Sequence, residues 1–153
     1  ADFAEQMAPL GTKLGVLLVQ LPPKLGFDGP VAERFFTALR KMIDAEIACE
    51  PRNATWFEDQ ADALLERLRV ARAAADPAPA VAAARPGGWQ GLAYWRLHGS
   101  PAMYRSSYPV EALQGYAQQV RSAVKKGRGA WCMFDNTAAA QATGNALSLM
   151  ARL

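Results

Sequence analysis

Five apolar segments of this chain each end in polar or charged residues, and these ends carry the side chains best suited to chemistry. The polar groups at the ends are Gln20, Glu50 and Arg52, Arg96 and His98, and Asp135 and Asn136. The segments are predicted to be buried parallel strands within residues 14–23, 45–52, 70–77, 91–101 and 130–137. Because α/β folds place their sites at the carboxyl ends of such strands, the sequence predicts where a site lies and leaves its reaction open.

Alternation of side chains along a strand sorts these residues into two faces. In the segment around residues 92–98, Tyr94, Arg96 and His98 share one face, and the opposite face is wholly apolar and suited to lie under helices. The polar face is then expected to point into a closed or curving sheet. The same alternation predicts that Gln20, Glu50 and Asn136 converge with Arg96 and His98. Arg52 is predicted to share a face with Glu50.

Arg96 and Glu50 are natural partners, because a buried charge without a partner costs several kcal/mol. Two interpretations follow from their pairing. In the first, they form a structural ion pair that closes the top of a barrel. In the second, Arg96 binds a carboxylate or phosphate and Glu50 transfers a proton. The residues alone leave both interpretations open.

His98 is the only histidine, so a histidine-rich metal site is excluded within these residues. It is either a hydrogen-bonded structural group or an acid–base catalyst beside Arg96. A carboxylate metal site would need Glu50, Asp76 and Asp135, whose spacing matches no ligand pattern. We therefore assign no metal ligand, and the cofactor stays unknown.

Two further segments carry candidate binding residues. Asp135-Asn136-Thr137 lies between a predicted strand and a predicted helix, where backbone N–H groups suit an anion, although a helix cap with turn residues explains the same pattern. Trp56 follows Pro51-Arg52-Asn53 and is interpreted either as a pocket wall or as a core residue at the start of a helix.

Helical periodicity appears between the predicted strands, and this alternation indicates an α/β fold. Helices are predicted over residues 31–42, 56–69, 109 to about 124, and 138–152. In the first, Val31, Phe35, Leu39 and Met42 are predicted to face inward. Thr137 is predicted to cap the last. Residues 76–88 are rich in proline, alanine and glycine, which predicts an irregular connection with one short turn around residues 81–84.

Composition bounds the class of protein. The 153 residues, 51% hydrophobic and 20% charged, indicate one globular domain or part of one, without an apolar run long enough for a bilayer. The start lacks a secretion signal, so a cytoplasmic location is expected. The net charge is +3, and the basic run Arg121, Lys125, Lys126 and Arg128 favours a solvated helix end over contact with nucleic acid. Cys49 and Cys132 are predicted to be small buried hydrophobes.

These residues make the chain similar to a known family. It resembles the YecE-like family, a bacterial and archaeal domain-of-unknown-function family with a TIM-barrel fold. The matching segments are KLGVLLVQLPP (13–23), EPRNATWF (50–57), PGGW (86–89), YWRLHGSPAMYRSSY (94–108) and WCMFDNTAAAQATGNAL (131–147). Asn145 matches a late asparagine of the family, and Ala140 stands where a glycine is common. The resemblance implies a TIM barrel and no established reaction.

Members of that family begin with about three further βα units that this sequence lacks. We therefore expect residues 1–153 to be a single domain that forms the C-terminal part of a TIM barrel, with about five parallel strands alternating with helices. Such a piece has two unpaired sheet edges. The expected partners are the remainder of the barrel or a second copy of the chain.

Three functional hypotheses remain open. The first is an enzyme acting on a small anionic or phosphorylated substrate, with Glu50 and His98 as catalytic residues. Its substrate-binding residues would be Arg52, Trp56, Arg96, Asp135, Asn136 and Gln20. The second is a metal-dependent phosphodiesterase or nuclease, by analogy of fold alone. The third is a non-catalytic binding module whose strand ends are structural ion pairs.

Overall fold

The computed structural model describes residues 2–153, and the side chains of all these residues except 2, 4 and 8. Strands β1 (Val16–Gln20), β2 (Glu46–Glu50) and β3 (Val70–Arg72) form a parallel sheet, to which the short β5 (Gly87–Gly88) adds antiparallel to β3. Strands β4 (Ala74–Asp76), β6 (Leu92–Leu97) and β7 (Gly129–Phe134) form a second parallel sheet. Each segment predicted as a strand is confirmed.

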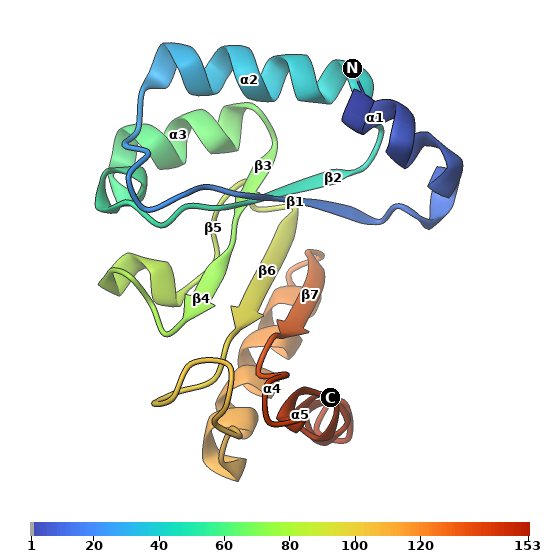
Figure 1. Ribbon diagram of the computed structural model, residues 1–153, viewed down its shortest axis with the longest axis vertical. Helices are drawn as coiled ribbons and strands as arrows, with labels where there is room; N and C mark the ends of the chain where they lie inside the picture. The colour runs from blue at the N-terminus through green and yellow to red at the C-terminus, as the bar shows by residue number, and fades with distance from the viewer. Residues whose placement is uncertain (1) are drawn as a thin grey trace.

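The two sheets are joined where β3 continues into β4. Ala73 alone separates these strands, and its N–H still donates to the carbonyl of Cys49 on β2, at 2.8 Å. The strands therefore form one curving wall, ending in β1 on one side and β7 on the other (Figure 1). Parallel strands that alternate with helices in this way define a partial (β/α)8 barrel.

Helices cover the outer face of this wall. Helices α2 (Gly29–Met42) and α3 (Asp59–Arg67) pack on the first sheet, and α4 (Val110–Lys125) and α5 (Gln141–Met150) pack on the second (Figure 1). The helix α1 (Asp2–Met7) and a 3-10 segment (Ala8–Lys13) precede β1. Two more 3-10 turns, at Ala54–Phe57 and Val81–Ala84, follow β2 and β4. The turn at Val81–Ala84 and the irregular connection around it are as predicted.

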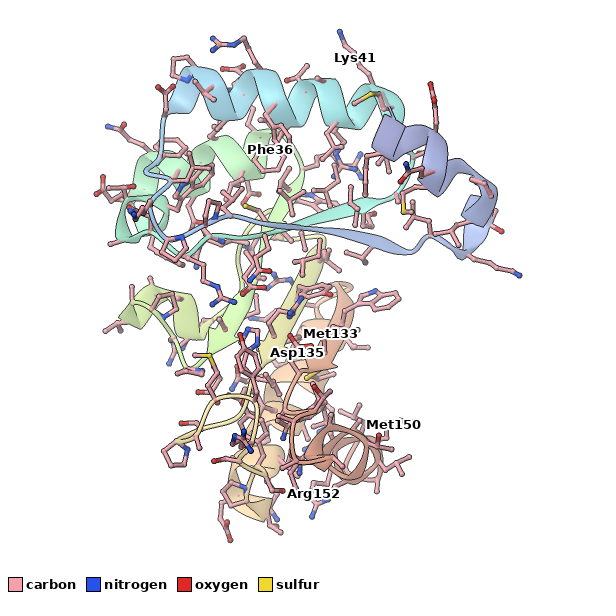
Figure 2. All side chains as sticks on the ribbon, in the orientation of Figure 1. Phe36, Lys41, Met133, Asp135, Met150 and Arg152 are labelled. Atoms are coloured by element: carbon pink, nitrogen blue, oxygen red, sulfur yellow. The ribbon has the colours of Figure 1, made fainter. Side chains whose placement is uncertain are left out.

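The inner stripe of α2 is displaced by one residue from the predicted one. Asp28 caps the helix by accepting a hydrogen bond from the Val31 N–H, at 2.9 Å. The buried residues are Ala32, Phe36 and Leu39, and Phe36 points from the helix toward the sheet (Figure 2). The predicted members Val31, Phe35 and Met42 are instead 47–50% exposed. Both sets have helical spacing and both are apolar, so periodicity could not choose between them.

The predicted ends of two other helices were wrong. The segment after β2 makes a 3-10 turn before α3 begins at Asp59, so the helix does not start at Trp56. The last helix begins at Gln141 rather than at residue 138, because Ala140 adopts a left-handed conformation with φ of 56°. Thr137 therefore forms a turn with Asp135 and does not cap α5.

The inner face of the wall is filled at one end and open along β7. Small and apolar residues fill it next to the strand starts, and they are Val16, Leu18, Ala48, Ala71, Ala73, Leu92 and Tyr94. On β7, Trp131 and Met133 face the same side and are 44% and 39% exposed. Within the described residues no helix is long and apolar enough to cross a bilayer.

Candidate functional site

Glu50 lies at the centre of a charged cluster at the carboxyl ends of the strands. It is the last residue of β2, next to Gln20 in register, and its side chain is 1% exposed. Arg52 turns back over it, so that Nε and Nη2 donate to Oε1 at 3.0 and 2.7 Å. A buried carboxylate is thus charge-paired by a residue only two positions away.

Arg96 and His98 reach Glu50 from β6, across the intervening strand. Arg96 Nε lies 3.6 Å from Glu50 Oε2, and His98 Nε2 lies 3.4 Å from Oε1. The intervening β3–β4 strand carries only alanine at the inward positions between them, Ala73 and Ala75. The small side chains leave room for the long ones to meet, and the predicted pairing of Arg96 with Glu50 is confirmed.

Asp135, which follows β7, completes the cluster. It accepts a hydrogen bond from Arg96 Nη2, and its Oδ2 lies 3.2 Å from His98 Nδ1. Figure 2 shows Asp135 beyond Met133 on this strand, near the middle of the molecule. His98 therefore lies between two carboxylates, one at each ring nitrogen. We call Glu50, Arg52, Arg96, His98 and Asp135 the rim cluster.

The electrostatics of the rim cluster fix the charge of Glu50. Burial works to raise the pKa of Glu50, but the hydrogen bond with His98 and the charges of Arg96 and Arg52 outweigh it and hold that pKa below 4.5. The surroundings of Glu50 therefore favour its ionised form. The two guanidiniums of the cluster balance its two carboxylates.

Several buried atoms of the rim cluster lack a well-directed hydrogen bond. They are Glu50 Oε2, Arg96 Nε and His98 Nδ1. Native structures pair nearly all buried polar atoms, so unpaired ones mark either strain or a site that receives a ligand or water. The side chains of Arg52, Arg96 and Asp135 are 21%, 19% and 30% exposed, so the cluster is open to solvent on one side.

Asn136 does not join the rim cluster, and this corrects the sequence analysis. Register pairs Arg96 with Met133 and Leu97 with Phe134, so Asp135 follows on the inner face and Asn136 on the other. The Nδ2 of Asn136 donates to the Ser106 carbonyl at 2.9 Å and to Asn145 Oδ1 at 2.7 Å. Its amide therefore fastens the loop that follows β6.

Asn145 and Tyr104 are the residues of this region that sequence reasoning did not place in the site. Asn145 Oδ1 also accepts from the Tyr108 N–H at 3.1 Å, and its Nδ2 donates to Ser107 Oγ at 2.9 Å. The loop held in this way carries Tyr104, whose ring meets His98 edge-on with centroids 5.7 Å apart. Only the family resemblance singled out Asn145, and no pattern singled out Tyr104.

Two other predicted site residues differ in their placement. Trp56 is 3% exposed, packs edge-on against Phe27, and donates from Nε1 to the Leu25 carbonyl at 3.0 Å, so the structure places it in the core and not with the cluster. Gln20 is exposed and lines a cavity of about 260 Å³ together with Arg52 and the Leu21–Pro23 segment. Gln20 therefore adjoins the rim cluster.

The remaining ionisable candidates are engaged elsewhere. Asp76 accepts a hydrogen bond from the Tyr108 hydroxyl at 2.7 Å, on the helix-covered side of the sheet. Cys49 and Cys132 are unpaired, and burial raises the pKa of both thiols, that of Cys132 to about 12.

Among the described residues, no three His, Cys, Asp or Glu side chains are grouped so that they could hold a metal ion.

The fold and the rim cluster together define a TIM-barrel-like protein with an ionic site at its strand ends. The model of the family described as "Protein of unknown function DUF72" matches residues 1–153, so the chain belongs to the DUF72 family. Comparison with curated proteins gives no match.

Solved structures of DUF72 proteins share this fold. A crystal structure of a DUF72 family protein from Enterococcus faecalis V583 covers 99% of this chain with a TM-score of 0.82 and 21% identity. One from Thermotoga maritima MSB8 covers 98% of it with a TM-score of 0.78 and 22% identity. The chain spans 63% and 62% of the lengths of those two proteins.

Proposed function

We propose that the rim cluster is the active site of an enzyme that acts on a small anionic or phosphorylated substrate. The observation that carries this proposal is the meeting of five ionisable side chains from three separate segments of the wall, with unpaired buried atoms on Glu50, Arg96 and His98. The position at the carboxyl ends of the strands is where barrel enzymes carry out their chemistry.

The two arginines are the groups that would bind the anion. Each guanidinium has five N–H donors, and the contacts with Glu50 and Asp135 use only part of them. A guanidinium suits phosphate or carboxylate because it can donate two parallel hydrogen bonds. The cavity beside Arg52 and Gln20 offers the space in which such a substrate would lie.

His98 is the group that would move a proton. An imidazole can both accept and donate a proton, and the carboxylates of Glu50 and Asp135 face its two nitrogens. Glu50, being ionised, acts as a positioning residue that holds both Arg52 and His98. The edge of the Tyr104 ring limits how His98 can turn.

A set of mutually satisfied ion pairs that only closes the barrel top is the competing explanation, and experiment separates the two. Phosphorylated metabolites are titrated into the chain, and hits are tested for turnover. We expect Arg96→Lys to weaken binding by roughly tenfold or more, because lysine cannot donate bidentately. We expect His98→Asn to retain binding and to lose turnover.

The matched control is Arg67→Lys, in an exposed ion pair with Glu33. This variant should bind every hit as the parent chain does. Should Arg96→Lys and His98→Asn leave the binding and turnover of all hits unchanged, the rim cluster is structural and the proposed function is wrong.

We also propose that the sheet beyond β1 and β7 is covered by the remainder of a barrel or by a second copy of the chain. The chain spans less than two thirds of the length of each of the two DUF72 proteins compared above. Trp131 and Met133 face the barrel interior while partly exposed, and an apolar cavity of about 410 Å³ beside β1 is lined by Phe3, Phe35 and Met42. Alone, residues 1–153 should self-associate in sedimentation velocity. A single monomeric species at all concentrations would contradict this proposal.

A further inference from the structure

Another cavity lies on the outer side of the wall, away from the rim cluster. It has a volume of about 570 Å³ and lies between α4 and the segment that follows β4. Ala93 and Trp95 of β6 line it, and both face the helices, opposite to Arg96. The cavity and the rim cluster are therefore on opposite faces of the same strand. We call this cavity the outer groove.

The outer groove exists because one barrel helix is replaced by coil. Residues 77–86 connect β4 to β5 and contain proline at positions 77, 79 and 86, so they form only the 3-10 turn Val81–Ala84 (Figure 1). A full helix in this place would cover the outer face of β6 beside α4. The short turn leaves that space open, and its size is that of a small-molecule site.

The charged residues that line the outer groove are all cationic. They are Arg85, Lys126 and Arg128. Within the part of the chain that the structure describes, none of the three lies within 4.0 Å of a carboxylate oxygen. Glu66 exerts a weaker attraction on Arg128 from a greater distance. Three like charges around one cavity, with no carboxylate among its lining residues, favour an anion in it.

Arg128 is held in place while its charge stays unpaired. Its Nη2 donates to the Leu92 carbonyl at 2.9 Å, and its buried Nε has no acceptor. Burial lowers the pKa of Arg128, and the attraction of Glu66 offsets this effect only in part. An oxyanion beside this guanidinium would supply that compensation.

Uncharged polar side chains from α4 complete the lining. Gln118 and Ser122 lie one helical turn apart, and Gln119 accepts from the Trp95 indole N–H at 3.4 Å. Amide and hydroxyl groups pair well with sugar hydroxyls. We propose that the outer groove binds a small sugar phosphate, with its phosphate on Arg85, Lys126 and Arg128 and its hydroxyls on the α4 side chains.

Ribose 5-phosphate serves as the probe, with ribose as the control that lacks the phosphate. Calorimetry measures affinity, and the indole ¹⁵N–¹H signal of Trp95 reports on the groove itself. We expect ribose 5-phosphate to bind and to shift the Trp95 signal, and ribose to do neither. The double variant Arg85→Gln/Lys126→Gln should weaken binding by roughly tenfold or more, because both residues are exposed cations of the site.

A second double variant controls for net charge. Arg34→Gln/Lys125→Gln removes the same charge from exposed positions that do not line the groove, and it should bind within about twofold of the parent chain. If both double variants lost the same affinity for ribose 5-phosphate, the binding would be explained by net charge alone, and the inference would be overturned. Absence of binding at millimolar ribose 5-phosphate would overturn it as well.

Arg96→Lys separates the outer groove from the rim cluster. We expect the Trp95 signal of this variant to shift over the same ribose 5-phosphate concentrations as in the parent chain, because Arg96 does not line the outer groove. If Arg96→Lys abolishes binding while Arg85→Gln/Lys126→Gln does not, the probe occupies the rim cluster, and the outer groove is not its site. That result would leave the proposed enzymatic function standing, so the two proposals fail separately.

Discussion

The cations of the rim cluster and those of the outer groove lie on opposite faces of β6 and differ in one respect. Arg52 and Arg96 each lie against a carboxylate that is itself largely or wholly buried. Arg85 and Lys126 are exposed and lie within 4.0 Å of no carboxylate that the structure describes. The difference teaches which charges the fold depends on. Removing one partner of a buried pair leaves the other uncompensated, whereas an unpaired, exposed cation can be removed at little cost.

The largest expected effect comes from removing the shared partner in the rim cluster. Glu50→Gln leaves Arg52, Arg96 and His98 close together without the central negative charge. We expect a loss of about 3–5 kcal/mol in the free energy of unfolding, the range for breaking a buried ion pair. Urea denaturation measures it.

Glu46→Gln, on the same strand, is the matched control. Its side chain is 42% exposed and lies 4.0 Å from Arg40, so its loss should cost no more than about 0.5 kcal/mol. Equal costs for the two variants would show that burial does not distinguish the rim cluster from a surface ion pair.

The second-largest effect is expected at low pH, where the rim cluster should contribute less to the free energy of unfolding. The pKa of Glu50 lies below 4.5 in the folded chain, so the folded state binds this proton less readily than the unfolded state. The stability from Glu50 is therefore fully present above about pH 4.5 and is lost as pH falls through the folded pKa. Denaturation of the parent chain and of Glu50→Gln from pH 6 to pH 3 measures it. The parent chain should lose more stability over this range, and parallel curves would contradict the assignment.

The smallest effect is expected in the outer groove. Lys126→Gln removes an exposed cation that has no ion pair in the described chain, so the free energy of unfolding should change by no more than about 0.5 kcal/mol. The same denaturation series measures it. A loss above about 1 kcal/mol would mean that the groove cations also hold the fold together, and the comparison would then fail.

The wall of the barrel was predictable from the sequence because each strand is a continuous apolar run between helical segments. Even the alanine-rich strand at residues 70–76 was placed correctly, by its position in the alternation and not by its propensity. Glu50, Arg52, Arg96, His98 and Asp135 were all named as site residues. The convergence of Glu50 with Arg96 and His98 follows from a general property of parallel sheets, whereas Asp135 was named as a binding residue without being placed beside them.

What depends on register or on packing was not predictable. Alternation is reliable within one strand, but only the pairing of β6 with β7 decides that Asp135 and not Asn136 lies beside Arg96. Trp56 could not be placed because a buried aromatic residue and a pocket wall have the same sequence pattern. Tyr104 lies in an irregular loop, where no periodicity points to its contact with His98.

The outer groove shows a different limit. The interpretation of Lys126 and Arg128 as a solvated helix end holds for the exposed Lys126 and not for Arg128, which is partly buried against the Leu92 carbonyl. The segment before β5 is an irregular connection, as predicted. The cavity results from their combination with Arg85 and the uncovered face of β6. Because the cavity is formed by segments that are far apart in the sequence, no single stretch of sequence could predict it.

Because the wall is divided between β3 and β4, the rim cluster also connects its two sheets. Glu50 belongs to one sheet, and Arg96 and His98 belong to the other, so their contacts tie together two halves of the wall that share a single continuous strand. A molecule that draws Arg96 away from Glu50 would loosen this tie, and the stiffness of the junction and the occupancy of the rim are thereby thermodynamically linked.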